Sequence, residues 1–258
     1  MERLVALREG TRTQFFYEKG TEIRFQPEIH RKFSVLTHLP ILNEFPAATW
    51  LKELLSEGVH QVRLKVEELR APSPPYKGKA KSLDGAHLAR FVARLKDESP
   101  ELFEDWVEHL RTALPDLEMV RTVLRPEDRH RYLMLRYTNG VEVPSWVVSD
   151  GTLRFMALTV LAYMPDSTGL YLIEEPEDGL HPTAIETVHQ SLTSLYQGQV
   201  LVATHSPVLL SLAKPEDILC CSKTPEGMQI VSGEVHPALR DWKGEVNLSD
   251  LFAAGVLG

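Results

Sequence analysis

Cysteine is scarce in this sequence, with Cys220 and Cys221 the only two among 258 residues. They are adjacent in the strand-like run DILCCS. Neighbouring side chains on a strand point to opposite faces, so we do not expect a disulfide between them. A metal site also needs more ligands than this pair offers. We therefore expect both to be packing residues in a reducing compartment.

Long hydrophobic runs are also missing. No apolar segment is long enough to cross a bilayer, and the start, MERLVALREG, lacks the apolar core of a signal peptide. The net charge of −8 argues against a general nucleic-acid coat, although a local basic patch stays compatible with it. We expect a cytoplasmic protein without a membrane partner.

The pattern along the chain predicts two parts. Residues 1–145 read mainly as β structure, including a hairpin around EKG and a strand at HQVRLKVEEL, with a helical insertion at about 83–114 that breaks near Pro100. Residues 146–258 alternate between helical runs and buried strands, which predicts a parallel sheet covered by helices. The fold class is therefore α/β, and we place Phe103 and Trp106 in its core.

Two apolar strands of the second part end on polar groups. LYLIEEP ends on Glu174 and Glu175, and VLVATHSP ends on Thr204, His205 and Ser206. Ligands of open α/β sheets bind at the carboxyl ends of strands, so these groups converge if the strands are neighbours. Paired carboxylates there suit phosphoryl transfer, in which one holds Mg²⁺ and the other orients the attacking water.

Each of these features has an ordinary interpretation on its own. An acidic pair after a strand can be a solvated loop or a helix cap, and a single histidine can be structural. SDGT, which includes Gly151, is a good turn sequence. It is their order and spacing together that indicate a site.

In that order the motifs resemble those of ABC-type ATPases of the RecF, SMC and OLD-nuclease kind, particularly bacterial AAA-family ATPases of the RecF-like branch. VSDGT (residues 148–152) resembles the ABC signature, and LYLIEEP resembles Walker B. EDGLHP (177–182) resembles the D-loop, with His181 where many relatives have Asp. THSP (204–207) resembles the switch-histidine loop.

The resemblance implies a P-loop NTPase-like ABC ATPase head that uses ATP and Mg²⁺. Glu174 then holds the metal, Glu175 is the catalytic base, and His205 senses the γ-phosphate. The implied nucleotide-binding residues are Ser149, Asp150, Gly151, Thr152, Asp178 and His181. In that family two heads sandwich two ATP molecules, so the expected partner is a second copy or a second ATPase chain.

The family also needs a Walker A loop, GxxxxGK[ST], and the 258 residues contain none. YKGKAKS (76–82) lacks the first glycine. Three explanations stay open: a truncated or misplaced start, a split gene whose partner chain carries the phosphate loop, or a degenerate subunit. Without that loop we expect the isolated chain to bind ATP poorly and to be inactive.

The first functional hypothesis is an ATPase in a DNA-repair or antiphage-defence system, with a separate effector nuclease and nucleic acid as candidate partners. Lys77, Lys79 and Lys81 could touch a nucleic-acid backbone, although a solvated loop is the more ordinary explanation. The alternative is a degenerate or split interaction subunit that donates its signature to a partner's ATP site in trans. A third hypothesis, a transporter nucleotide-binding subunit, is the weakest of the three, because the signature and the β-rich first part do not resemble those of transporter ATPases.

Overall fold

The computed structural model describes residues 6–9, 12–16, 23–25, 32, 34–38, 45–75, 83–165, 167–225, 227–239 and 248–255. The chain divides into two compact units, Met1–His60 and Gln61–Gly258. The boundary expected between residues 145 and 146 stays a prediction. Lys77, Lys79 and Lys81 lie outside the described residues.

The first unit begins with an antiparallel sheet in the order β1-β2-β3. Its strands are Ala6–Glu9, Arg12–Phe16 and Ile23–Phe25. The antiparallel pairing of β2 with β3 confirms the expected hairpin, whose EKG turn lies outside the described residues. A short 3₁₀ turn (η1, Leu36–His38), helix α1 (Pro46–Glu53) and a π-helical turn (η2, Leu54–Gly58) follow.

The run HQVRLKVEEL is not the single strand expected. Strand β4 (Val59–Val62) crosses the unit boundary and ends early, and α2 (Val66–Arg70) follows. A short apolar run fits both periodicities, and Glu, Leu and Arg all favour a helix. Tertiary packing settles the outcome, because the helix places Leu69 in the core at 2% exposure.

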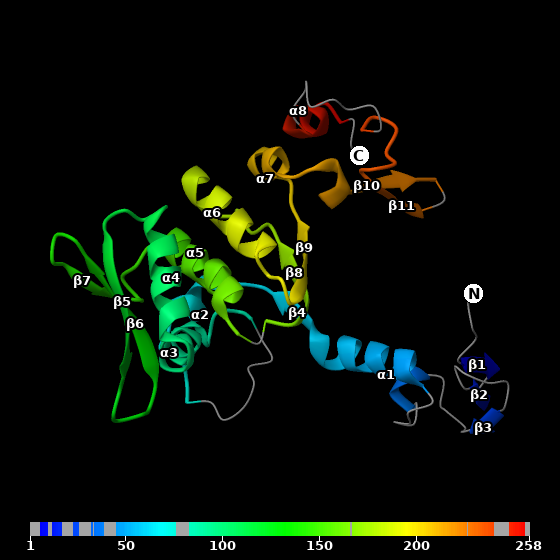
Figure 1. Ribbon diagram of the computed structural model, residues 1–258, viewed down its shortest axis with the longest axis horizontal. Coiled ribbons are helices and arrows are strands. Elements are labelled where there is room, and N and C mark those ends of the chain that lie inside the picture. The colour runs from blue at the N-terminus through cyan, green and yellow to red at the C-terminus, as the bar shows by residue number, and fades with distance from the viewer. Residues whose placement is uncertain are drawn as a thin grey trace. The chain divides into compact units, whose positions relative to one another are not determined.

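The stretch expected to be helical at about 83–114 contains two helices, α3 (Leu88–Glu98) and α4 (Pro100–Arg111), which meet at Ser99. Phe103 and Trp106 are buried as expected. Trp106 also donates its indole N–H to Thr159 Oγ1 at 3.0 Å. Strands β5 (Leu117–Leu124), β6 (Arg131–Tyr137) and β7 (Glu142–Pro144) then form an antiparallel sheet beside these helices (Figure 1).

The expected parallel sheet is present, in the order β4-β8-β9. Helix α5 (Asp150–Thr159) and the 3₁₀ turn η3 (Val160–Tyr163) lead into β8 (Gly169–Glu174). Helix α6 (Pro182–Thr193) then leads into β9 (Gly198–Ala203), which pairs in parallel with β8. Helices α5 and α6 lie together on one side of these two strands (Figure 1).

One expectation about this sheet is wrong, because β9 is not buried on both faces. Its residues alternate between half-buried and exposed, and Leu201 is 48% exposed. The helices of the described part of Gln61–Gly258 cover the face that carries Tyr171 and Ile173 of β8. An apolar run alone does not tell whether one face or both will be covered.

The chain ends with α7 (Pro207–Leu212), the 3₁₀ turn η4 (Pro215–Asp217), the hairpin β10–β11 (Leu219–Thr224 and Gly227–Ser232) and α8 (Leu248–Ala253). Both cysteines are free thiols, and Cys220 is buried as expected. Cys221 is exposed, so the expectation that it is a packing residue is wrong, because it lies on the other face of β10. No helix within the described residues has the length and apolar character that crossing a membrane requires.

Candidate functional site

The two acidic residues stand where β8 ends. Glu174 is the last residue of the strand, and its side chain is 65% exposed, with Oε1 3.8 Å from Arg63 Nη2. The amide of Glu175 donates to the Ala203 carbonyl at 2.8 Å, which extends the parallel ladder by one bond. Glu175 then turns the chain with a φ of +43°, in the left-handed region that L-residues other than Asn and Asp rarely adopt. Strain of this kind concentrates at functional sites.

The polar end of β9 meets Glu175, as expected for neighbouring parallel strands. The backbone N–H of His205 donates to Glu175 Oε2 at 3.3 Å. The His205 ring nitrogen Nε2 lies 3.7 Å from Glu175 Oε1, and the ring itself is 82% exposed. It also lies beside Phe252 of α8, with ring centroids 6.1 Å apart. An acidic group and an imidazole thus share one solvent-facing edge of the sheet.

Glu177 belongs to the same cluster and was not among the site residues expected from the sequence, where it appeared only as the first residue of the D-loop-like EDGLHP. Its Oε1 accepts a hydrogen bond from the Thr204 hydroxyl, while its Oε2 is buried without a partner. Burial raises the pKa of Glu177, and the nearby Glu175 carboxyl raises it further against the lowering effect of the Thr204 hydrogen bond. Thr204 Oγ1 in turn accepts from the Ser206 amide at 2.9 Å. Glu177 therefore ties the turn after β8 to the loop after β9.

The signature-like segment forms the start of α5. Ser149 is the N-cap residue, and its Oγ accepts from the Thr152 amide at 3.2 Å and donates to Thr152 Oγ1 at 2.8 Å. This arrangement explains why SDGT begins a helix, since a capping serine satisfies one of the free amides of the first turn. Ser149 and Thr152 hydroxyls are therefore exposed at a positive helix end, where an anion is favoured.

Asp150 is held by an arginine rather than left free. Arg70 of α2 donates from Nε to Asp150 Oδ1 at 3.0 Å, pairs with the same oxygen through Nη2, and donates from Nη1 to the Trp146 carbonyl at 2.8 Å. The buried Ser145 hydroxyl donates to the carbonyl of Arg70 at 3.0 Å. Arg70 thus offsets a negative charge that would otherwise repel a phosphate at this helix end.

Close packing joins the signature-like start of α5 to the turn that contains Gly179. A Cβ on Gly151 would lie 2.5 Å from the carbonyl oxygen of Gly179, so only glycine fits at this position without a shift. Arg154 of α5 also reaches Asp178, with Nη2 and Oδ2 3.6 Å apart. The amide of Asp178 donates to the Glu175 carbonyl at 3.0 Å, so this contact continues into the turn of the acidic pair.

The structure therefore brings Glu175, Glu177, Thr204 and His205 together, and it brings Gly151 and Arg154 to the turn at residues 178–179. His181 has a structural task, since it caps α6 by accepting from the Thr183 amide at 3.3 Å. Within the described residues, no hydrogen bond or ion pair joins Ser149 or Thr152 to the acidic pair. The start of α5 and the Glu175 cluster are connected through the turn at residues 175–179.

The donor set at the end of β8 fits Mg²⁺ and does not fit a protein-only metal site. No group of three or more His, Cys, Asp or Glu residues converges on one point within the described part of the chain. Mg²⁺ is commonly held through one or two carboxylates together with water and substrate phosphates. The exposed Glu174 carboxylate can serve as the one protein ligand of such an ion.

Heads of SMC proteins are among the solved structures similar to this chain. An Smc head bound to the C-winged helix domain of ScpA has 17% identity and a TM-score of 0.45, over 62% of this chain and 59% of that chain. A structure reported for ATP-driven dimerization and DNA stimulated activation of SMC ATPases has 16% identity and a TM-score of 0.44, over 58% and 93%. An Smc head with a coiled coil from Pyrococcus yayanosii has 18% identity and a TM-score of 0.41, over 55% and 30%.

No curated protein matches the chain. A family model described as "AAA domain, putative AbiEii toxin, Type IV TA system" matches residues 40–211, which is most of the sequence and includes every residue of the candidate site described in this subsection except Phe252. This match confirms the expected resemblance to AAA-family ATPases. The chain belongs to that AAA-domain family.

Proposed function

We propose that this chain provides the signature, Walker B and switch-histidine part of an ABC-type ATPase head, which binds and hydrolyses ATP with Mg²⁺. Family membership supports an ATPase-type function and nucleotide binding in general. The observation that carries the proposal is the meeting of Glu175 with the Thr204–His205 loop at the carboxyl ends of β8 and β9. A carboxylate and an imidazole at this edge suit phosphoryl transfer.

In this proposal each polar group at the sheet edge has a separate task. Glu174 binds Mg²⁺, and the ion when bound neutralises charge on the phosphates. Glu175 accepts a hydrogen bond from the attacking water and so orients it. His205 donates to the γ-phosphate from a ring that is 82% exposed to solvent. The contact between Glu175 and His205 holds the two side chains next to each other until a nucleotide binds between them.

The signature takes part in the second half of the proposal, in which ATP joins two heads. Ser149, Gly151 and Thr152 present hydroxyl and amide groups at the start of α5 to a phosphate held by the other head. Arg70 keeps Asp150 from opposing that contact. The D-loop residues Asp178 and His181 would line the same junction, and their exposure is compatible with this.

The absence of GxxxxGK[ST] from the 258 residues favours a second candidate function. The chain would then be a split or degenerate interaction subunit that donates its signature to the ATP site of a partner. The two candidates differ at Glu175, since a pure donor has no use for a base in its own site. A DNA-repair or antiphage-defence setting, with an effector on another chain, is the biological context that we propose for either.

The decisive experiment is Glu175→Gln in the protein isolated from its own cells with any chains that accompany it. Gln keeps the size of the side chain and its acceptor oxygen, and it loses the charge that polarises water. We expect ATP turnover to fall by about 10²-fold or more, in line with loss of a general base. Binding of ATP and ATP-dependent association are expected to persist.

Glu186→Gln is the matched control, because it removes the same charge from an exposed position on α6. Its turnover should equal that of the unmodified protein. If Glu175→Gln retained full turnover while the protein hydrolysed ATP, the candidate with a catalytic Glu175 would be refuted and the signature-donor role favoured.

A further inference from the structure

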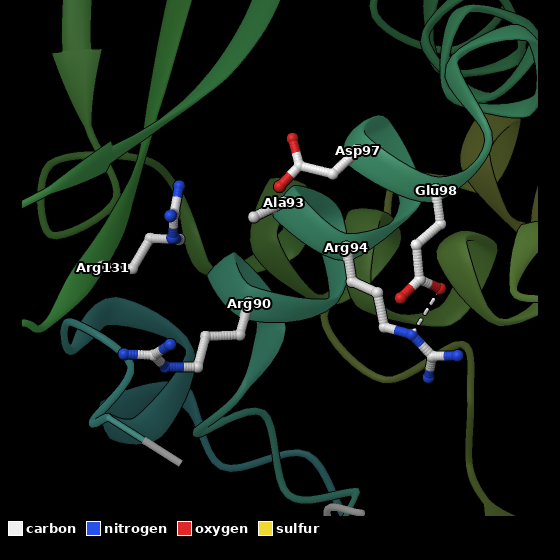
Figure 2. Close-up of a pocket in the computed structure, with 6 residues that line it drawn as sticks. All are labelled: Arg90, Ala93, Arg94, Asp97, Glu98 and Arg131. Atoms are coloured by element: carbon white, nitrogen blue, oxygen red, sulfur yellow. Dashed lines mark hydrogen bonds and ion pairs between the residues drawn. The ribbon is translucent and has the colours of Figure 1, made fainter. Parts of the chain in front are cut away.

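A second charged site lies on the face formed by α3 and β6. A cavity of about 240 Å³ is lined there by Arg90, Ala93, Arg94, Asp97, Glu98 and Arg131 (Figure 2). All but Arg131 come from α3, at positions that share one side of the helix, and Arg131 is the first residue of β6. The size suits a phosphate group with its hydration shell.

Among the described residues, two of the three arginines of the cavity have only neutral hydrogen-bond partners. Arg90 donates from Nε to the Pro74 carbonyl and from Nη2 to the Arg129 carbonyl, the latter at 2.7 Å. Arg131 donates from Nη1 to Thr122 Oγ1 at 2.8 Å. These bonds fix both guanidinium groups in place without neutralising their charge.

Eight other arginines of the described residues each form an ion pair with a carboxylate; they are Arg63, Arg70, Arg94, Arg111, Arg121, Arg125, Arg136 and Arg154. Arg129, whose charge also acts on Arg90, lies outside the lining of the cavity. In Figure 2 the Arg94–Glu98 pair lies apart from Arg90 and Arg131 along the lining of the cavity. The unneutralised charge of the site is therefore concentrated at Arg90 and Arg131.

The environment of Arg90 supports the conclusion that positive charge is concentrated at this end of the cavity. Burial lowers the pKa of Arg90, and the positive charges of Arg131 and Arg129 lower it further. Repulsion of this kind is relieved when an anion enters between the guanidinium groups. Asp97 is exposed at the rim and forms no ion pair among the described residues, so it opposes an incoming anion.

We propose that the cavity between α3 and β6 binds a phosphate group through Arg90 and Arg131, with Asp97 limiting its affinity. Two fixed guanidinium forks can each present paired N–H donors to phosphate oxygens. The phosphate can belong to a nucleic-acid backbone or to a small phosphate-bearing ligand, and the same experiment separates the two. The site is apart from the Glu175 cluster and does not rest on ATP hydrolysis.

The test is fluorescence anisotropy of the full chain with a labelled single-stranded oligodeoxynucleotide of about 16 nucleotides, and inorganic phosphate serves as competitor at matched ionic strength. Arg131→Gln removes one guanidinium from the cavity. Asp97→Asn removes the opposing carboxylate. Arg136→Gln is the control, because it takes the same charge from the other face of β6, where Arg136 pairs with Glu118.

We expect Arg131→Gln to weaken binding about fivefold or more and to reduce the slope of log affinity against log salt by about 1. Asp97→Asn should tighten binding by about two- to threefold, a gain that misfolding cannot produce. Arg136→Gln should leave both quantities unchanged. Oligonucleotide binding that is much tighter than phosphate binding identifies a backbone ligand, and equal binding of the two probes identifies a small one.

The proposal fails if neither probe binds the unmodified chain. It also fails if Arg131→Gln and Arg136→Gln weaken binding equally, because the attraction would then come from the overall charge of the chain and not from the cavity. A third outcome against the proposal is an affinity that Asp97→Asn leaves unchanged. Arg90→Gln repeats the test from the other wall of the cavity, with circular dichroism to check that the fold is retained.

Discussion

At the residue scale, the Glu177 carboxyl group links two loops, and its contribution to the free energy of unfolding depends on pH. Its pKa is raised above the ordinary value of 4.5 by burial and by the neighbouring Glu175. The protonated form is therefore the one that the fold favours. The stability that this group contributes is present below its unfolded pKa and is lost as pH rises through the folded pKa.

Replacing Glu177 with Gln should remove the contribution of this group to the pH dependence of stability. Gln keeps an acceptor for the Thr204 hydroxyl and cannot ionise, so the variant avoids the cost of a charge beside the buried Oε2 position. We expect the melting temperature of Glu177→Gln, relative to the unmodified protein, to rise between about pH 4.5 and neutrality. Thermal unfolding across this range measures it. A relative melting temperature that stays constant or declines would contradict the assignment.

The sequence located some of these residues and not others, for physical reasons. Glu174, Glu175 and His205 follow apolar strands, and this position is visible in a single chain. Glu177 is not, because its burial depends on the neighbouring loop after β9. Arg90 and Arg131 share a cavity only after α3 has packed on β6, a contact between segments that no local pattern records.

At the scale of the elements, the Arg70–Asp150 contact fixes α2 to the first turn of α5. Arg70 uses three nitrogens, two toward one carboxylate oxygen and one toward the Trp146 carbonyl. Both side chains are partly exposed, at 33% and 54%, so solvent screens much of the attraction. The main effect of the pair is to set the position of the helix start.

A double-mutant cycle measures how far the two elements are coupled. For Arg70→Gln and Asp150→Asn we expect a coupling of about 0.5–1 kcal/mol in the free energy of unfolding. The exposed i,i+4 pair Arg94–Glu98 is the reference, with about 0.3–0.5 kcal/mol expected. Chemical denaturation gives both values. If the Arg70 and Asp150 changes were additive, the contact would not couple the elements.

Most helices and strands could be predicted from the sequence, and the predictions that were wrong share one physical cause. The break at Pro100, the start of α5 at SDGT and the parallel pairing of β8 with β9 all rest on strong local signals. The helix α2 and the half-open face of β9 were missed. In both places, packing by distant residues decides what a short apolar run becomes.

At the scale of the whole molecule, the signature, the acidic pair and the histidine loop are present in one chain that has no GxxxxGK[ST] motif. Loop amides and the lysine of that motif supply much of the affinity for phosphates in P-loop proteins. We therefore expect the 258-residue chain alone to show no saturation by ATP in the micromolar range. Isothermal titration calorimetry checks this, and saturable micromolar binding would overturn it.

The different exposure of the two cysteines provides a native labelling position. Burial raises the pKa of the Cys220 thiol and keeps it largely protonated, while Cys221 faces solvent on the other side of β10. A maleimide dye should therefore attach to Cys221 without any engineered residue. Cys220 packs with Leu248 of α8, and the same helix carries Phe252 beside His205. A dye on Cys221 would thus report, as a change in fluorescence, when the histidine loop moves.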